Sequence, residues 1–252
     1  MSDEHVRQAT VFGSFAEEYD RWRPGYPDEA VDWLLPPGAR DVLDLGAGTG
    51  KLTASLLARD LRVTVVEPDP AMLAVLTRAH PSVVVHRAGA DALPLPDRSV
   101  DAVVVGQAWH WFPHEAAVAE VRRVLRPGGW LGVVWNLPDD REPWERDLAE
   151  LDPERDVRSR ALVPTSGPPE VEGLPAGEVQ RTSVHWTWEL APDDVRAMLA
   201  TDSRIAVLPE RERDELLDAS AAVVTAEAHR RGAETVPLHR VSVCFRWRPG
   251  GW

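Results

Sequence analysis

Three glycines and two acidic residues have the types and spacing of a nucleoside-binding turn. Gly46, Gly48 and Gly50 follow Asp44 at every second position. Glycine tolerates positive φ and lets a ligand approach the backbone closely. Glu67 comes about 20 residues later, the spacing at which an acidic residue binds ribose hydroxyls. These residues predict a nucleoside site, with the alternative that Glu67 only caps a helix.

The glycine spacing argues against two other nucleotide sites. A dinucleotide-binding turn has the pattern G-x-G-x-x-G, and Lys51 stands where its third glycine is needed. A phosphate-binding loop has Ser or Thr after Gly-Lys, whereas this chain has Leu52 there. A carboxylate at Asp44 would repel a pyrophosphate but can hold an ammonium group through water. We expect a nucleoside with an amino-acid tail; a nicotinamide-dependent oxidoreductase is the weaker alternative.

The elements that position these residues alternate between strands and helices. The apolar residues Val42, Leu43 and Leu45 predict a buried strand and residues 51–59 a helix, so the glycines form the turn between them. A second strand at 62–67 ends at Glu67, and Asp69 is expected to cap the next helix. This arrangement places the site at the carboxyl edge of a parallel sheet.

The same alternation continues to about residue 136, and the pattern is weaker after it. In the first part we expect further strands at 83–86, 99–106 and 130–135 and a helix at 114–125. In the second part we expect helices at 193–199 and 210–230, strands at 179–188 and 238–247, and a helix with Trp144, Leu148 and Leu151 on one face.

These elements predict an α/β fold with a Rossmann-like, doubly wound mixed sheet of seven strands, the last of them antiparallel. The length of 252 residues suits a single domain, residues 1–252. Within it we expect N-terminal lid helices in residues 1–37, a cofactor-binding core in 38–136, and substrate-side insertions with the terminal strand pair in 137–252.

Two stretches resemble a known enzyme family. The glycine turn resembles motif I of class I S-adenosylmethionine-dependent methyltransferases. The N-terminal residues Tyr19, Arg23 and Tyr26, with a proline after each of the last two, resemble those of trans-aconitate methyltransferase-like enzymes in the methyltransferase type 11 group. In that group the segment lies over the methionine end of the cofactor, which implies that Tyr19 and Arg23 bind there. The alternative is an ordinary packed helix and turn.

The resemblance also assigns cofactor roles to residues further along the chain. It implies that Glu67 binds the ribose, that Met72 packs on the adenine, and that Asp91 accepts a hydrogen bond from the adenine amino group. Gln107, at the end of the strand at 99–106, is a further cofactor-binding candidate. The alternatives are a core position for Met72 and a solvated loop at Asp91.

The acceptor side is predicted at the loop after the strand at 99–106. Trp109, His110 and Trp111 follow one another directly, so they cannot all point into one core. We expect His110 to face the acceptor as a general base, between tryptophans that line the substrate pocket. The alternative is that the aromatic residues only pack against the next helix.

Other substrate-side residues depend on the acceptor. His185 is a second candidate base. A carboxylate acceptor needs no base, and Arg23, Arg204 or Arg240 would then supply its charge partner. The sequence does not select among these possibilities.

Composition narrows the class of partner. The net charge is −13, without a basic run, which argues against nucleic acid and anionic membranes. Cys244 is the single cysteine, which excludes an internal disulfide and a thiolate metal cluster, and no metal site is expected. There is no signal peptide pattern and no apolar stretch of membrane-spanning length.

We therefore expect a cytoplasmic S-adenosylmethionine-dependent methyltransferase that acts on a small molecule, with O-methylation as one option. Its oligomeric state is left open. The alternative is a methyltransferase fold that binds the cofactor without methyl transfer.

Overall fold

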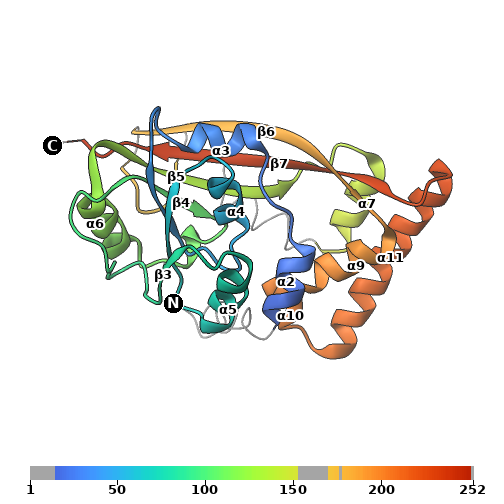
Figure 1. Cartoon of the computed structure of the whole chain (residues 1–252). Helices are drawn as coiled ribbons and strands as arrows, with labels where there is room; N and C mark the ends of the chain where they lie inside the picture. Colours follow the sequence, from blue (N-terminus) through green and yellow to red (C-terminus); the bar gives the residue numbers. More distant parts are fainter. Residues whose placement is uncertain (1–14, 153–169, 176–177, 251–252) are drawn as a thin grey trace. The chain divides into compact units, whose positions relative to one another are not determined.

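The computed structural model describes residues 15–152, 170–175 and 178–250 (Figure 1). These residues form two compact units. The core unit comprises residues 25–136, 170–175, 178–184 and 242–250, and the helical unit comprises residues 15–24, 137–152 and 185–241. Parts of the predicted lid and insertion, at 1–14 and 153–169, lie outside the described residues. The three-segment division of a single domain remains a prediction.

The strands form one seven-stranded sheet in the order β3-β2-β1-β4-β5-β7-β6. The neighbouring pairs from β3 to β5 are parallel, and the β7–β6 end is antiparallel. The strands are β1 (Asp41–Leu45), β2 (Arg62–Val66), β3 (Val84–His86), β4 (Val100–Gly106), β5 (Leu125–Pro138), β6 (Val179–Leu190) and β7 (Val236–Trp247). The predicted Rossmann-like fold is confirmed. Its strand order reverses between β1 and β4, where such sheets bind ligands.

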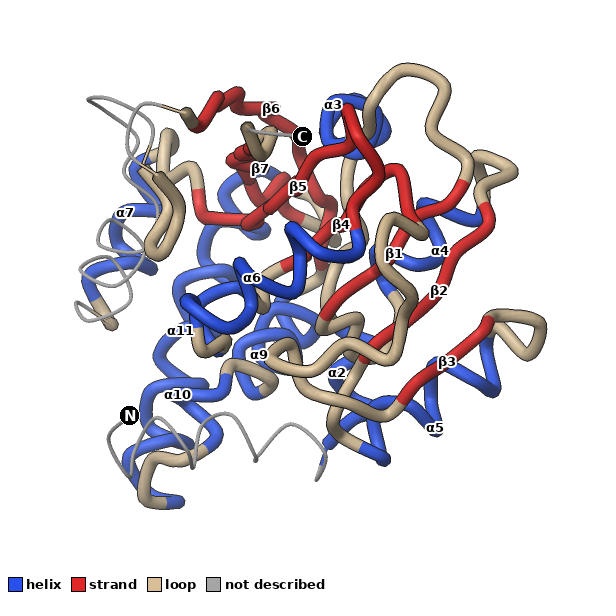
Figure 2. The backbone as a smooth tube through the Cα atoms, turned by 90° about the vertical axis from the view of Figure 1, so that its left-hand side faces the viewer, coloured by secondary structure: helices blue, strands red, loops and turns tan. Residues whose placement is uncertain are grey.

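Two apolar layers cover the parallel strands of the core unit. Its helices are α3 (Asp28–Leu34), α4 (Lys51–Leu57), α5 (Pro70–Ala79) and α6 (His114–Val124). The first three share one apolar cluster with alternate residues of β1, β2 and β4. On the other face α6 buries Ala117, Val121 and Val124 (Figure 2). Because both faces are covered, the strands are almost continuously apolar.

Strand β5 starts earlier than the sequence predicts. The expected strand was 130–135, but Leu125 already pairs with Val100, directly after α6 ends. The register then shifts by a bulge that holds Gly129, where an added Cβ would lie 2.5 Å from the carbonyl oxygen of Asp101. The Pro-Gly-Gly sequence therefore bends a strand here instead of separating a helix from a strand.

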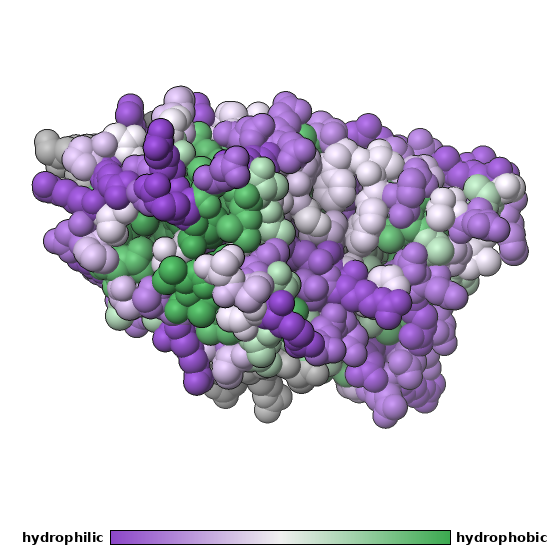
Figure 3. All heavy atoms as spheres, in the orientation of Figure 1, coloured by the Kyte–Doolittle hydropathy of each residue, from purple (hydrophilic) through white to green (hydrophobic). Residues whose placement is uncertain are grey.

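The helical unit has its own apolar core. Its helices are α2 (Ala16–Trp22), α7 (Pro143–Glu150), α9 (Pro192–Ala200), α10 (Ser203–Ala206) and α11 (Glu210–Arg231). Trp144, Leu148, Val195, Met198 and Val224 belong to one cluster. The outer side of α11 is hydrophilic (Figure 3). No helix among the described residues combines the length and apolar character needed to cross a bilayer.

One sequence prediction is wrong in the helical unit, and one short helix was missed. Leu151 does not share the buried face of Trp144 and Leu148, because α7 ends at Glu150 and Leu151 is exposed. The short helix α10 was not predicted. Asp202 caps its N-terminus, because the carboxylate of Asp202 accepts a hydrogen bond from the backbone N–H of Arg204 at 3.0 Å.

Candidate functional site

The glycine turn and the loop at 107–112 are packed together in the core unit. Gly46 has a φ of +70°, and an added Cβ would lie 2.8 Å from the Cβ of Ala108 and 2.9 Å from Phe112 Cζ. A side chain at Gly46 would therefore push the two loops apart. The structure thus brings together the two segments that the sequence assigns to cofactor and acceptor.

Gly48 leaves room above the turn. Its φ is +58°, and among the described residues no heavy atom beyond Gly48 and its two chain neighbours lies within 4 Å of the position that a Cβ would take. Its backbone N–H donates to Glu67 Oε2 at 3.0 Å. The turn is therefore fixed from one side while its backbone stays accessible, as a bound nucleoside requires.

Glu67 hydrogen-bonds to two parts of the predicted nucleoside site, the glycine turn and the start of α5. It is 8% exposed, and its Oε1 accepts a hydrogen bond from the backbone N–H of Asp69 at 2.9 Å. Asp69 in turn caps α5, as predicted, by accepting from the N–H groups of Ala71 and Met72. Burial raises the pKa of Glu67. Each carboxylate oxygen has a second lone pair, so these bonds are compatible with the predicted ribose contact.

Asp44 is a fully buried acid beneath the turn. Thr53 Oγ1 donates to its Oδ2 at 2.6 Å, whereas its Oδ1 has no hydrogen-bond partner among the described residues. Burial raises the pKa of Asp44 to about 7. A buried acceptor of this kind fits a ligand that brings a positive charge. Thr53 was missed in the sequence, although a hydroxyl in the first turn after the glycines was an available signal.

The two adenine-side candidates lie on different elements. Met72 is a buried side chain in the first turn of α5. Asp91 is exposed in the loop at 88–97, and its Oδ1 is 2.4 Å from the position that a Cβ of Gly89 would take. The carboxylate of Asp91 can lie over the backbone there because Gly89 has no side chain. The adenine contacts of both residues remain predictions.

Gln107 adopts an unusual conformation at the end of β4. Its φ is +60°, which is uncommon for a residue with a side chain. Its backbone N–H donates to the carbonyl oxygen of Val134 at 2.9 Å, and its Nε2 donates to that of Asn136 at 3.2 Å. These bonds hold a strained residue at the sheet edge, where such strain is often associated with function.

The Trp-His-Trp segment forms a short 3-10 helix, η2 (Trp109–Trp111). Trp109 is buried, stacks on His114 and donates from Nε1 to the carbonyl oxygen of Glu172 at 2.9 Å. His110 and Trp111 are half-buried, with ring centroids 4.5 Å apart. The setting of Trp109 matches the packing alternative, and the roles predicted for His110 and Trp111 remain open to test.

The helical unit gathers several candidates from its own residues near the start of α10. Arg23 Nε donates to Thr201 Oγ1 at 2.9 Å, and its guanidinium lies 5.5 Å from the ring centre of Tyr19. Arg204 Nη1 donates to Asp152 Oδ1 at 2.6 Å, and its Nη2 donates to the other oxygen. Asp202 lies near both arginines, at 3.6 and 3.9 Å. Further along the chain, the buried Arg240 has its Nη2 3.1 Å from Met198 Sδ.

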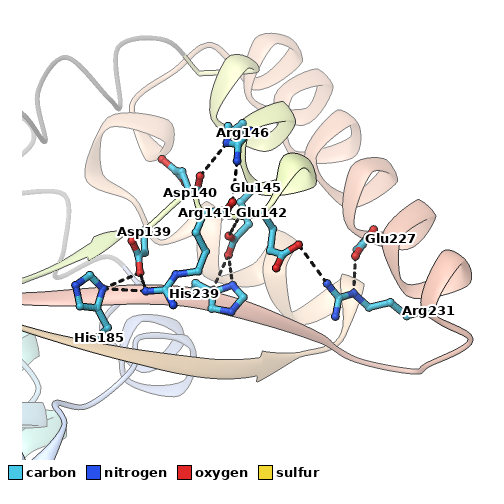
Figure 4. Close-up of polar contacts among 10 residues, drawn as sticks. All are labelled: Asp139, Asp140, Arg141, Glu142, Glu145, Arg146, His185, Glu227, Arg231 and His239. Carbon is cyan, nitrogen blue, oxygen red and sulfur yellow. Dashed lines mark hydrogen bonds and ion pairs between the residues drawn. The ribbon is translucent and has the colours of Figure 1, made fainter.

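His185 lies apart from that group, on β6 (Figure 4). Its Nδ1 is 2.8 Å from Asp139 Oδ2 and 3.0 Å from Arg141 Nη2, and Arg141 also pairs with Asp139. In the tautomer whose Nδ1–H donates to Asp139, the other ring nitrogen is a proton acceptor. Sequence analysis missed Asp139 and Arg141, which lie in a stretch of mixed charges without a distinguishing motif.

Comparison with known proteins identifies the family. The profile of the methyltransferase domain matches residues 43–133. An uncharacterized methyltransferase of Mycobacterium tuberculosis is 44% identical over 240 residues, which cover 93% of this chain and 94% of that protein. An uncharacterized methyltransferase-like protein of Schizosaccharomyces pombe is 32% identical over 211 residues, which cover 82% of each.

A solved structure agrees with these sequence relatives. A protein of Anaeromyxobacter dehalogenans, assigned as a type II methyltransferase, aligns with a TM-score of 0.63 and 29% identity, covering 90% of this chain and 97% of that one. The oxidoreductase alternative finds no support among these relatives. Together with the glycine turn and the sheet order, they show that the chain belongs to the class I methyltransferases, enzymes whose cofactor is S-adenosylmethionine.

Proposed function

We propose that this enzyme methylates an oxygen of a small organic molecule, with His110 accepting the proton that the acceptor loses. The observation that carries the proposal is the close packing of Gly46 against Ala108 and Phe112. It supports the proposal because the loop predicted to face the acceptor packs directly against the turn predicted to bind the cofactor. S-adenosylmethionine supplies a methyl group that is already activated by the positive charge of its sulfur.

In this proposal, different residues of the core unit bind different parts of the cofactor. Glu67 accepts hydrogen bonds from the ribose hydroxyls while it fixes Gly48. Asp44 holds the ammonium group of the methionine tail through water. Met72 and Asp91 bind the adenine, and Gln107 shapes the sheet edge beside it. The predicted contacts of Tyr19 and Arg23 with the methionine end are kept as part of the proposal.

The protein's remaining task is to orient the acceptor. In-line displacement needs the attacking oxygen at roughly 3–3.5 Å from the methyl carbon. A neutral imidazole at His110 takes the hydroxyl proton as the oxygen–carbon bond forms and the carbon–sulfur bond breaks. Trp111 would line the pocket beside His110.

Ion pairing in the helical unit supports a hydroxyl acceptor over a carboxylate. Arg204 already has a bidentate partner in Asp152. A substrate carboxylate at Arg204 would have to compete with Asp152. The net charge of −13 supports a small-molecule acceptor over nucleic acid.

Transfer of a labelled methyl group tests the proposal. The protein is incubated with S-adenosylmethionine labelled in its methyl carbon and with a pool of small metabolites, and products are separated by mass. A labelled product of low mass with a new methyl ether is expected, whereas a methyl ester would indicate a carboxylate acceptor and no need for a base at His110. Tight binding of S-adenosylhomocysteine without any labelled product would instead indicate a methyltransferase fold that does not transfer methyl groups to this pool.

A further inference from the structure

Two side chains of α6 hold the loop at 88–97 in place. Glu120 Oε2 accepts a hydrogen bond from the backbone N–H of Leu93 at 2.7 Å. Arg123 donates to two carbonyl oxygens of the same loop, from Nη2 to Leu93 at 2.9 Å and from Nη1 to Leu95 at 2.7 Å. The loop is therefore held by side chains of α6, a helix that follows it in the sequence only after β4 and η2.

The two side chains also bind one another. Arg123 Nε donates to Glu120 Oε1 at 2.8 Å and Nη2 donates to Oε2 at 2.7 Å, while Nη1 reaches Asp97 at 2.9 Å. Hydrogen bonding to Arg123 lowers the pKa of Glu120, and hydrogen bonding to Glu120 raises that of Arg123. Both groups stay charged, and only the planar fork of an arginine can serve all these acceptors at once.

The bonds set which loop residues face inward. Leu93 and Leu95, whose backbones are bonded to α6, have buried side chains, whereas Asp91 is exposed. The end of the loop is tied as well, because the N–H of Arg98 donates to the carbonyl oxygen of Arg123 at 2.9 Å. Asp91 is the residue of this loop for which a function is predicted. It thus projects from backbone that is held two residues later, at Leu93, by the hydrogen bond to Glu120.

We propose that Glu120 and Arg123 are positioning residues for cofactor recognition, which hold the loop so that Asp91 meets the amino group of the adenine. This inference rests on the proposed function, and specifically on the role of Asp91. The bonds of both residues run to the loop and to one another. Their effect is to keep the acceptor oxygen of Asp91 in place before the cofactor binds, so that binding does not have to order the loop.

Arg126 provides a matched control in the same unit. It lies three residues after Arg123, and its side chain is 39% exposed compared with 31% for Arg123. Its Nη1 donates to Asp41 at 2.7 Å and to Asp101 at 2.8 Å, near the amino ends of β1 and β4. Arg126 therefore has comparable ion pairs at the edge of the sheet opposite the site.

The experiment measures the affinity of two ligands by calorimetry. S-adenosylhomocysteine has the adenine amino group, whereas its analogue with unsubstituted purine in place of adenine has only a hydrogen on that carbon and cannot donate to Asp91. Arg123→Gln should weaken S-adenosylhomocysteine binding by roughly tenfold and leave binding of the purine analogue within about twofold. Arg126→Gln should leave both affinities unchanged. Circular dichroism melts compare the stability of the two variants.

The outcomes separate the positioning role from a structural one. Equal weakening of both ligands by Arg123→Gln, or equal effects of Arg123→Gln and Arg126→Gln, would overturn the proposal. If Arg123→Gln does not fold, Glu120→Gln takes its place, with the same loss of preference for the adenine ligand expected. If the wild-type protein binds both ligands with equal affinity, Asp91 does not recognise the adenine amino group, and this proposal is wrong. A wild-type protein that binds neither would instead overturn the proposed function itself.

Discussion

Glu67 in the core unit and Glu145 in the helical unit are buried glutamates that each accept hydrogen bonds from two backbone amides. Glu67 is 8% exposed and accepts from Gly48 at 3.0 Å and Asp69 at 2.9 Å. Glu145 is 1% exposed and accepts from His239 at 2.6 Å and Glu142 at 3.0 Å (Figure 4). Seen as local geometry, the two carboxylates are nearly equivalent.

Their surroundings differ in ways that point to function. Beside Glu67 lies a turn with open space above Gly48 and a second buried acid, Asp44, whose Oδ1 has no partner among the described residues. Glu145 instead joins the start of α7 to β7, and His239 Nδ1 adds a contact at 3.1 Å. A buried acid is thus a weak indicator of a site by itself. Accessible backbone beside it and an unused acceptor nearby are the stronger indicators.

The largest effect is expected from the two candidate bases, His110 in the core unit and His185 in the helical unit. His110→Ala should lower turnover by roughly 10²–10⁴-fold, the contribution of a positioned general base, with cofactor affinity nearly unchanged. His185→Ala should have a much smaller effect if the core unit supplies the base. The measurement is the rate of labelled methyl transfer to the acceptor found by the metabolite screen.

His110→Gln refines this result, because glutamine can hydrogen-bond but cannot take the proton. If it restores most of the activity, His110 orients an acceptor that needs no base. A large loss at His185 instead would assign the base to the helical unit, where Asp139 holds the imidazole at 2.8 Å. Wild-type rates for variants at both positions would mean that the Trp-His-Trp segment is packing alone.

The two buried glutamates provide the second prediction. Glu67→Gln and Glu145→Gln should each destabilise the protein by roughly 1–3 kcal/mol, because each leaves a buried donor without its charged acceptor. Only Glu67→Gln should also weaken S-adenosylhomocysteine binding, by roughly 10- to 100-fold. Denaturant unfolding and calorimetry measure the two quantities. Equal affinity losses in the two variants would show that Glu67 acts through stability and not through the ribose.

The core unit was the more predictable of the two because its interactions join residues that lie close together in the sequence. The strand–glycine–helix turn, the cap at Asp69 and the acid at Glu67 each follow from residues within about two dozen positions of one another. Thr53, nine positions after Asp44, was missed only because a threonine in a helix has many other uses. Five parallel strands were placed correctly by their apolar runs, with an error where the bulge at Gly129 extends β5.

The helical unit depends on pairs that no local pattern indicates. Arg23 bonds to Thr201 across 178 positions, and His185 meets Asp139 across 46. Sequence analysis identified Arg23, Arg204 and His185 as chemically able residues, but it could not find their partners. The partners matter most, because Asp152 already engages Arg204 and Asp139 orients His185.

The smallest expected effect is a pH dependence that arises in the core unit, at Asp44. Burial raises the pKa of Asp44 from 3.8 to about 7. A group whose pKa rises on folding stabilises the fold fully below its unfolded value, so this contribution is lost between about pH 4 and pH 7. Cofactor binding has the opposite sign, because only ionised Asp44 attracts the ammonium group. Affinity for S-adenosylhomocysteine should therefore rise roughly tenfold from pH 6 to pH 8.

Calorimetry at several pH values, in buffers with different heats of ionisation, measures both the affinity and the protons released. Binding near pH 6 should release roughly one proton per ligand, and Asp44→Asn should abolish the release. Thr53→Val should move the midpoint to higher pH, because the hydrogen bond from Thr53 lowers the pKa of Asp44. If the profile survives Asp44→Asn and moves with Glu67→Gln, the titrating acid is Glu67, whose pKa is also raised by burial. The ammonium group of the ligand would then have to be held by another residue, and the unused oxygen of Asp44 would no longer distinguish the core unit from the helical one.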